Sequence, residues 1–207
     1  MSGVAVQSAA RLRPAGVAWA EAALVTVGLA AAVGARLAAT RGGLDLLFVG
    51  AAFGLALLAL VAVTGERPRV GAARWTQALA GAGVGLGLVA VAIGGGLLSG
   101  APLVAGLGRP ASPLAAWAVV TILVAVAEEA VLRGLLFEGI RRAGGTLAAL
   151  LVTSVVFVLL HVPLYGWHVV PLDLAVGLAL GGLRVATRGI AAPAVAHAVA
   201  DLATWWL

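Results

Sequence analysis

The sequence predicts an all-α, polytopic helical membrane protein. Three observations favour this class: 63% of the 207 residues are hydrophobic, only 10% are charged, and the mean hydropathy is +1.14. A soluble domain has about 45–50% apolar residues. The apolar runs are continuous rather than alternating, which argues against the strands of a membrane β-barrel. We therefore expect one transmembrane domain over residues 1–207 and no soluble second domain.

About seven transmembrane helices are expected. A spanning helix needs about 20 apolar residues, and segments of this kind follow one another along the chain. The expected segments are Trp19–Ala39, Leu44–Val63, Trp75–Leu98, Pro113–Glu138, Thr146–Leu164, Val169–Ala186 and Ile190–Leu207. The glycine-rich stretch Gly94–Gly108 leaves six to eight spans open, because it can end or break a helix. The Gly/Ala run at residues 80–87 predicts a tight packing surface.

The basic residues are all arginines, and their distribution predicts the orientation. With a cytoplasmic N-terminus, nine arginines lie inside: Arg11, Arg13, Arg67, Arg69, Arg74, Arg141, Arg142, Arg184 and Arg188. Three lie outside, namely Arg36, Arg41 and Arg109, and Arg133 is intramembrane. This bias predicts a multi-pass protein of the cell membrane with a cytoplasmic N-terminus. Its partners are then membrane lipids rather than nucleic acid. The absence of cysteine excludes disulfides and a cysteine nucleophile.

Glu128, Glu129 and Arg133 lie within the fourth apolar segment. A charged side chain at the bilayer centre costs about 2.5–3.5 kcal/mol on insertion scales, so such residues mark functional sites. Glu129 and Arg133 are one helical turn apart and are expected to pair. Glu128 points about 100° away from Glu129 on a helix and is left without that partner. Desolvation disfavours a charged carboxyl group, which suits general acid–base catalysis. The alternative is a salt-bridge cluster without chemistry.

Two later segments each carry polar residues. His161 follows Phe157 by one turn, so the phenyl ring can flank the imidazole; the alternative is a hydrogen-bonded packing histidine. His197 and Asp201 share a helix face, and either Asp201 orients His197 or both groups polarise a carbonyl. His168 belongs to a polar-aromatic loop at the outer interface and is left out of the site.

The depths of these residues in the membrane agree. Counting from the inner boundaries at about 1.5 Å per residue, Glu128 lies about 20 Å deep, His161 about 24 Å, His197 about 12 Å and Asp201 about 18 Å. Tilted, packed helices would bring the four together in the middle of the bilayer. The fourth, fifth and seventh segments are therefore expected to line one polar cavity.

Three short motifs occur in order on these helices. They are Glu128-Glu129-x-x-x-Arg133, Phe157-x-x-x-His161 and His197-x-x-x-Asp201. In this order they resemble the CPBP family of CAAX proteases and bacteriocin-processing (Abi) membrane proteins. The resemblance covers roughly Ala111 to Asp201, so the core helices of the site are expected over about 111–207. It implies a CAAX-type intramembrane endopeptidase, either glutamate-type or metal-dependent.

The resemblance also implies a role for each site residue. Glu128 is the general base that activates a water together with His161, and His197 stabilises the oxyanion. Asp201 accompanies His197, but a carboxylate cannot donate a hydrogen bond unless it is protonated, so orienting His197 is the role we assign to it. The supporting residues are Glu129, Arg133 and Phe157.

The family is described as metalloproteases, so a divalent metal such as zinc is one possibility. Glu128, His161 and His197 would then be its three ligands. The chain lacks a His-Glu-x-x-His helix, and we favour a site without a tightly bound metal.

The expected substrate is a membrane-embedded or lipid-modified peptide or protein. The alternatives are a non-catalytic scaffold or bacteriocin-immunity protein, and a proton- or metal-coupled transporter.

Overall fold

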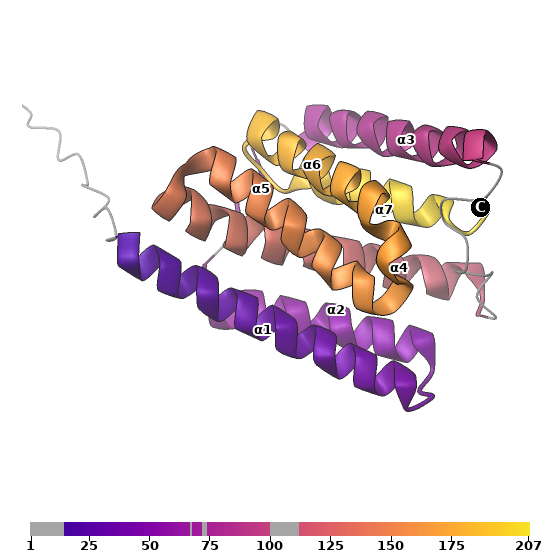
Figure 1. Ribbon diagram of the computed structural model, residues 1–207, viewed down its shortest axis with the longest axis horizontal. Coiled ribbons are helices and arrows are strands. Elements are labelled where there is room, and N and C mark those ends of the chain that lie inside the picture. Colours follow the sequence, from indigo (N-terminus) through magenta and orange to yellow (C-terminus); the bar gives the residue numbers. More distant parts are fainter. Residues whose placement is uncertain (1–14, 67, 72–73, 100–111) are drawn as a thin grey trace, which may run out of the picture.

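The computed structural model describes residues 15–66, 68–71, 74–99 and 112–207, and these residues fold as packed helices (Figure 1). The elements are α1 (Ala15–Arg41), α2 (Leu46–Val63), α3 (Arg74–Ser99), α4 (Leu114–Glu129), a π-helical segment (Ala130–Leu136), α5 (Phe137–Tyr165), a 3-10 turn (Trp167–Val169), α6 (Val170–Thr187) and α7 (Ala191–Ala203). The expectations for Arg11, Arg13, Arg67, Arg109 and the stretch from Gly100 to Gly108 lie outside the described residues.

Five of the described helices are long and apolar enough to cross a membrane. The longest is a 52-residue run, Leu114–Tyr165, which contains a non-helical residue, Gly145, at φ 87° and ψ 174°. The chain reverses direction there (Figure 1). As a result the Arg133 guanidinium lies 4.9 Å from the centroid of the Phe157 ring, whereas 24 residues of straight helix would separate them by about 36 Å. The run therefore supplies two of the predicted segments. The chain is a multi-pass helical membrane protein.

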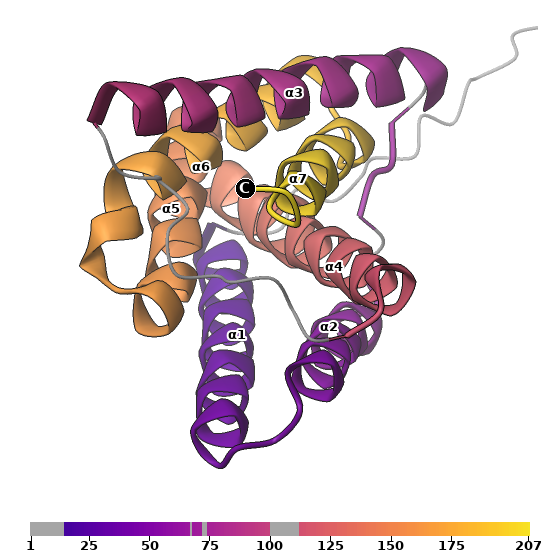
Figure 2. The ribbon, with the colours of Figure 1, turned by 90° about the vertical axis from the view of Figure 1, so that its right-hand side faces the viewer.

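The seventh segment differs from the expectation. A helix was expected over Ile190–Leu207, but α7 ends at Ala203. Its 13 residues span about 20 Å, which is less than the hydrocarbon core of about 30 Å. The helix lies inside the bundle, between α3, α4 and α6 (Figure 2). Here α7 is an interior helix that presents His197 to its neighbours, rather than a complete span.

Small residues hold α3 against α7. Gly81 and Gly85 lie one turn apart on the face of α3 that contacts α7. A Cβ atom on Gly85 would lie 2.8 Å from the carbonyl oxygen of Ala196, and one on Gly81 would collide with that of Ala192. Gly83, by contrast, faces open space. The predicted packing surface at residues 80–87 is therefore confirmed for the glycines that face α7.

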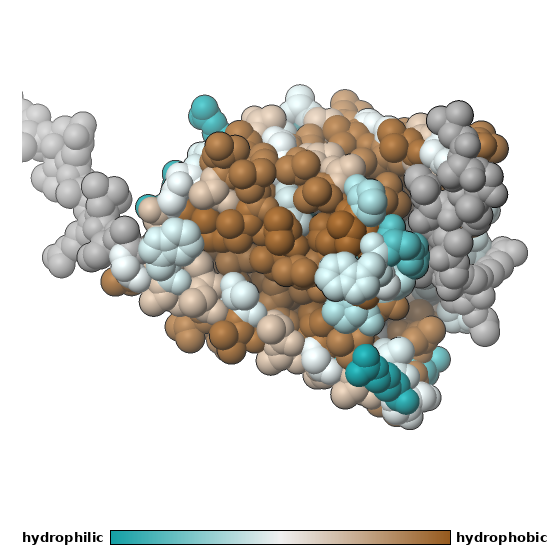
Figure 3. All heavy atoms as spheres, viewed as in Figure 1, coloured by the Kyte–Doolittle hydropathy of each residue, from teal (hydrophilic) through white to brown (hydrophobic). Residues whose placement is uncertain are grey.

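The N-terminal helix α1 packs one face against α2 and α5. Its buried residues recur every three or four positions: Ala18, Ala22, Val25, Leu29 and Val33. This spacing is the mark of a helix that buries a single stripe. Apolar side chains on other faces are exposed, and hydrophobic residues cover most of the molecular face in Figure 3. Such a surface suits contact with lipid tails.

One end of the bundle is closed by the segment between α2 and α3. Ile190 N–H donates to the Arg69 carbonyl oxygen at 2.9 Å, and Ala191 N–H donates to the Val70 carbonyl oxygen at 3.4 Å. Pro68 lies so close to Gly134 that a Cβ atom there would be 2.9 Å from the proline ring. Arginines gather at this end as well, since four of them lie around Glu138 and a fifth ends α6: Arg69, Arg141, Arg142, Arg184 and Arg188.

Candidate active site

A buried ion pair forms the base of the site. Arg133 donates from its NH1 group to Glu129 Oε1 at 2.8 Å, and both side chains are inaccessible to solvent. This is the pair that the four-residue spacing predicts. The same Glu129 oxygen lies 3.1 Å from His197 Nδ1. One carboxylate thus connects the fourth apolar segment to α7, and its hydrogen bond with Nδ1 orients the imidazole.

Arg133 lies on a turn that sequence reasoning missed. We expected an α-helix through Pro113–Glu138, but Ala130–Leu136 is π-helical and buried at every residue. Such wider turns occur often at functional sites. Two hydrogen bonds connect the π-helical turn to α6. Arg133 NH2 donates to the Gly177 carbonyl oxygen at 3.2 Å, and Arg184 Nε donates to the Arg133 carbonyl oxygen at 2.9 Å. The π-helical turn is therefore fixed by buried arginines.

Glu128 is buried between two nitrogen-bearing side chains. Its Oε2 atom lies 3.8 Å from His197 Nε2, and its Oε1 atom lies 3.9 Å from Arg36 NH1. One expectation is corrected here, because Arg36 was counted among the outer arginines. Glu128, which was expected to be left without Arg133 as a partner, has Arg36 as its cationic neighbour. Because Arg36 lies on the buried face of α1, it reaches the site instead.

His197 is the centre of the cluster, and carboxylates face both of its ring nitrogens. Nδ1 faces Glu129, while Nε2 lies 3.4 Å from Asp201 Oδ2 as well as 3.8 Å from Glu128. An imidazole in this setting can hold a proton on each nitrogen. The position of Asp201, one turn after His197 on α7, is suited to orienting the ring.

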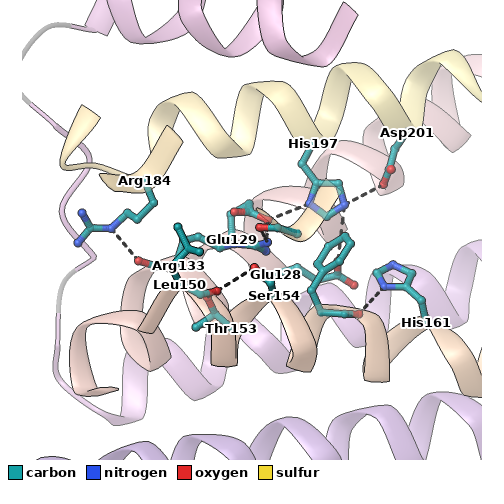
Figure 4. Close-up of polar contacts among 12 residues, drawn as sticks. Glu128, Glu129, Arg133, Leu150, Thr153, Ser154, His161, Arg184, His197 and Asp201 are labelled. Atoms are coloured by element: carbon teal, nitrogen blue, oxygen red, sulfur yellow. Dashed lines mark hydrogen bonds and ion pairs between the residues drawn. The ribbon is translucent and has the colours of Figure 1, made fainter. Parts of the chain in front are cut away.

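His161 lies beside this cluster, separated from His197 by Phe157. The Phe157 ring centroid is 4.5 Å from that of His161 and 5.4 Å from that of His197. His161 Nδ1 lies 2.8 Å from the Phe157 carbonyl oxygen, so Nδ1 carries the proton and Nε2 is left as the acceptor. Figure 4 shows Glu128, His161, His197 and Asp201 facing one region from three helical segments. His168 is exposed in the 3-10 turn.

Sequence reasoning missed three neighbours of the site. Asp173 Oδ2 lies 3.9 Å from His161 Nδ1, and Tyr165 stacks on the His161 ring with centroids 5.8 Å apart. The third is Arg36. A signal was present for two of them, because Arg36 and Asp173 are charged residues inside apolar segments. Neither belongs to a motif, and only the fold brings them to the site.

Exposure increases from one end of the site to the other. The side chains of Glu129 and Arg133 are fully buried, and those of Glu128 and His197 are 2–3% exposed. His161 reaches 17% and Asp201 reaches 41%. The site therefore opens at the end of the bundle where α5 and α7 terminate, away from the segment at residues 68–71.

The donor atoms were tested against the expected metal site. A catalytic zinc ion needs three protein ligands, and Glu128, His161 and His197 were the candidates. Among the residues that the structure describes, no group of three His, Cys, Asp or Glu side chains is arranged to hold a metal ion. Glu128, His161 and His197 therefore do not fit a zinc site in this arrangement.

Comparison with known proteins identifies the part of the chain that carries these residues. No curated protein and no solved structure matches the chain. Residues 110–203 match the family model described as "Type II CAAX prenyl endopeptidase Rce1-like". The match includes all three motifs and leaves out α1, α2 and α3. Family membership suggests an intramembrane protease. Residues 110–203 are thus a domain of the Rce1-like type II CAAX prenyl endopeptidase (CPBP) family.

Proposed function

We propose that the protein is an intramembrane endopeptidase that hydrolyses a peptide bond of a lipid-modified or membrane-embedded substrate. The observation that carries the proposal is the position of Glu128. Its carboxylate is buried next to His197 Nε2 at 3.8 Å, in a site that opens at one end of the bundle. The distance is too long for a direct hydrogen bond, so His197 Nε2 can bind a substrate oxygen next to the carboxylate. Family membership favours prenylated CAAX proteins as the substrate class.

The reaction begins with a water held between Glu128 and His161. Glu128 removes one proton as the water oxygen attacks the scissile carbonyl carbon, and His161 Nε2 accepts a hydrogen bond that orients the water. General-base assistance of this kind contributes about 10²–10⁴-fold. Phe157 keeps the two imidazoles apart, so that His161 can orient the water while His197 contacts the carbonyl oxygen.

His197 then meets the charge that develops on the carbonyl oxygen. With both nitrogens protonated, it donates from Nε2 to the oxyanion while Nδ1 stays bonded to Glu129. Asp201 keeps the ring in this orientation. Collapse of the tetrahedral intermediate breaks the C–N bond, and Glu128 returns its proton to the leaving amine. The products are a carboxylic acid and an amine, and Glu128 ends unprotonated.

A cleavage assay in proteoliposomes tests the proposal. Purified protein is incubated with a prenylated CAAX peptide and, separately, with a non-prenylated transmembrane peptide, and products are identified by mass spectrometry. Glu128→Gln and His197→Ala should each lower the rate by about 10²-fold or more. Glu21→Gln and His168→Ala are the matched controls, because these residues lie away from the site, and they should retain the wild-type rate.

The same preparation distinguishes the alternatives. No cleavage of either peptide, with Glu128-dependent ion flux across the vesicles, would support a transporter instead. Cleavage that persists in Glu128→Gln would contradict the assigned base. The proposal also expects that a chelator leaves the rate unchanged, and zinc-restored activity after chelation would replace the mechanism written here with a metal-dependent one.

A further inference from the structure

We propose that Arg36, on helix α1, is a catalytic residue that donates hydrogen bonds to the carbonyl oxygen of the scissile bond as it becomes an oxyanion. This inference rests on the proposed function. It adds a residue from outside the matched family domain, because α1 precedes residues 110–203. The N-terminal part of the chain would then contribute to the chemistry as well as to the packing.

The fold directs Arg36 inward. The buried stripe of α1 ends with Leu29 and Val33, and Arg36 follows Val33 by three residues on the same face. Its guanidinium lies 4.7 Å from the centroid of the Phe53 ring on α2. A cation over an aromatic face is held in place while its N–H groups stay available. Its side chain is 20% exposed, so a substrate can reach it from the open end.

Arg36 forms an ion pair with Glu128 and is close enough to contact the same reacting group. Arg36 NH1 lies 3.9 Å from Glu128 Oε1, too far for a hydrogen bond. A water on Glu128 attacks a carbonyl carbon about 3–3.5 Å away, and the carbonyl oxygen is about 1.2 Å from that carbon. A guanidinium beside Glu128 is therefore within reach of this oxygen.

The charges of the site favour a second cation beside His197. Arg133 is occupied by Glu129 and by the Gly177 carbonyl oxygen. Three further carboxylates surround the histidines: Glu128, Asp173 and Asp201. A new negative charge among them would be repelled strongly in a medium of low dielectric constant. A fixed donor with a positive charge is the arrangement that stabilises an oxyanion in such a site.

Steady-state kinetics of Arg36→Gln and Arg36→Lys test the proposal, with Arg41→Gln as the control. Arg41 is exposed at the end of the same helix. We expect Arg36→Gln to lower kcat by about 10²–10³-fold, the size reported for loss of one oxyanion donor, with KM changed less than threefold. Arg36→Lys should recover part of kcat, and added guanidinium should raise the rate of Arg36→Gly. Arg41→Gln should match the wild type.

Four results would overturn it. A wild-type rate of peptide cleavage by Arg36→Gln would show that Arg36 does not stabilise the oxyanion. A raised KM for a free-acid peptide but not for its C-terminal amide would make Arg36 a binder of the substrate carboxylate. A rate that recovers at higher pH would make it a group that only keeps Glu128 charged. Equal losses of activity and thermal stability, without guanidinium rescue, would make its role structural. Failure of the wild-type protein to cleave any peptide would instead remove the proposed function.

Discussion

A single oxygen of Glu129 joins two parts of the site that are far apart in sequence. It accepts hydrogen bonds from Arg133, on its own helical run, and from His197, on α7. Both contacts are buried, so neither is weakened by water. Besides neutralising charge, the Glu129–Arg133 pair therefore orients the imidazole of a histidine on another helix.

Removing Arg133 tests this arrangement. Arg133→Met removes the arginine partner of the buried Glu129 carboxylate and leaves it with His197 alone, and we expect a loss of stability of about 3–5 kcal/mol. The double variant Glu129→Gln/Arg133→Met removes both charges and should recover much of this loss, although His197 loses its charged partner and activity stays low. Thermal unfolding in detergent measures the stability.

Arg141→Met is the control for that experiment. Arg141 pairs with Glu138 at 2.7 Å, but its side chain is 41% exposed, so its loss should cost less than about 1 kcal/mol. Equal effects of Arg133→Met and Arg141→Met would contradict the buried ion pair.

At the scale of helices, the packing of α3 on α7 positions His197. Gly85→Ala places a Cβ atom 2.8 Å from the Ala196 carbonyl oxygen, so α7 must shift. Gly83→Ala meets nothing within 4 Å and should be neutral or stabilising, since alanine favours helix by about 1 kcal/mol over glycine. We expect Gly85→Ala to lower both the unfolding temperature and the cleavage rate. Similar results for the two variants would show that this contact is unimportant.

Helix positions were largely predictable, because each follows from a run of apolar residues about 20 long. Two local features of the helices could not be predicted from the sequence. The π-helical turn at Ala130–Leu136 has no sequence signal, since its residues read as ordinary apolar helix. The short length of α7 was also missed, because the apolar run at Ile190–Leu207 continues past the end of the helix at Ala203. Both depend on how the neighbouring helices pack.

The candidate site also contains residues that the sequence indicates and residues that it does not. Glu128, His161, His197 and Asp201 could be proposed as site residues from the sequence, because each is a polar residue in a hydrophobic helix with a motif spacing. Arg36 was assigned to the wrong environment, because its position near the end of a segment looks the same as an interface arginine. Only the direction of the buried stripe on α1 distinguishes the two, and that direction becomes certain once the partner helices are known.

The whole molecule has two unlike ends. The end near residues 68–71 is closed and carries most of the described arginines, while the opposite end exposes Asp201 and the loop containing His168. Moving Arg36 from the outer group to the site strengthens the charge asymmetry from which the orientation was predicted. From the positive-inside tendency we predict that the closed end lies in the cytoplasm and the open end of the site on the other side.

Cysteine labelling tests this orientation, and the chain has no cysteine of its own to interfere. Leu44 and Thr64 flank α2 at its two ends and are both exposed. In intact cells, we expect Leu44→Cys to react with a membrane-impermeant maleimide and Thr64→Cys to react only after permeabilisation. The reverse pattern would place the open end of the site in the cytoplasm.

The role of Glu128 as the base of an intramembrane hydrolase can be tested with one comparison. The initial rate of peptide cleavage is measured for the wild type, Glu128→Gln and Glu21→Gln at equal amounts of folded, inserted protein. We predict cleavage by the wild type and Glu21→Gln, and a rate at least about 10²-fold lower for Glu128→Gln. Equal cleavage by all three proteins, or none by the wild type on either class of peptide, would contradict it.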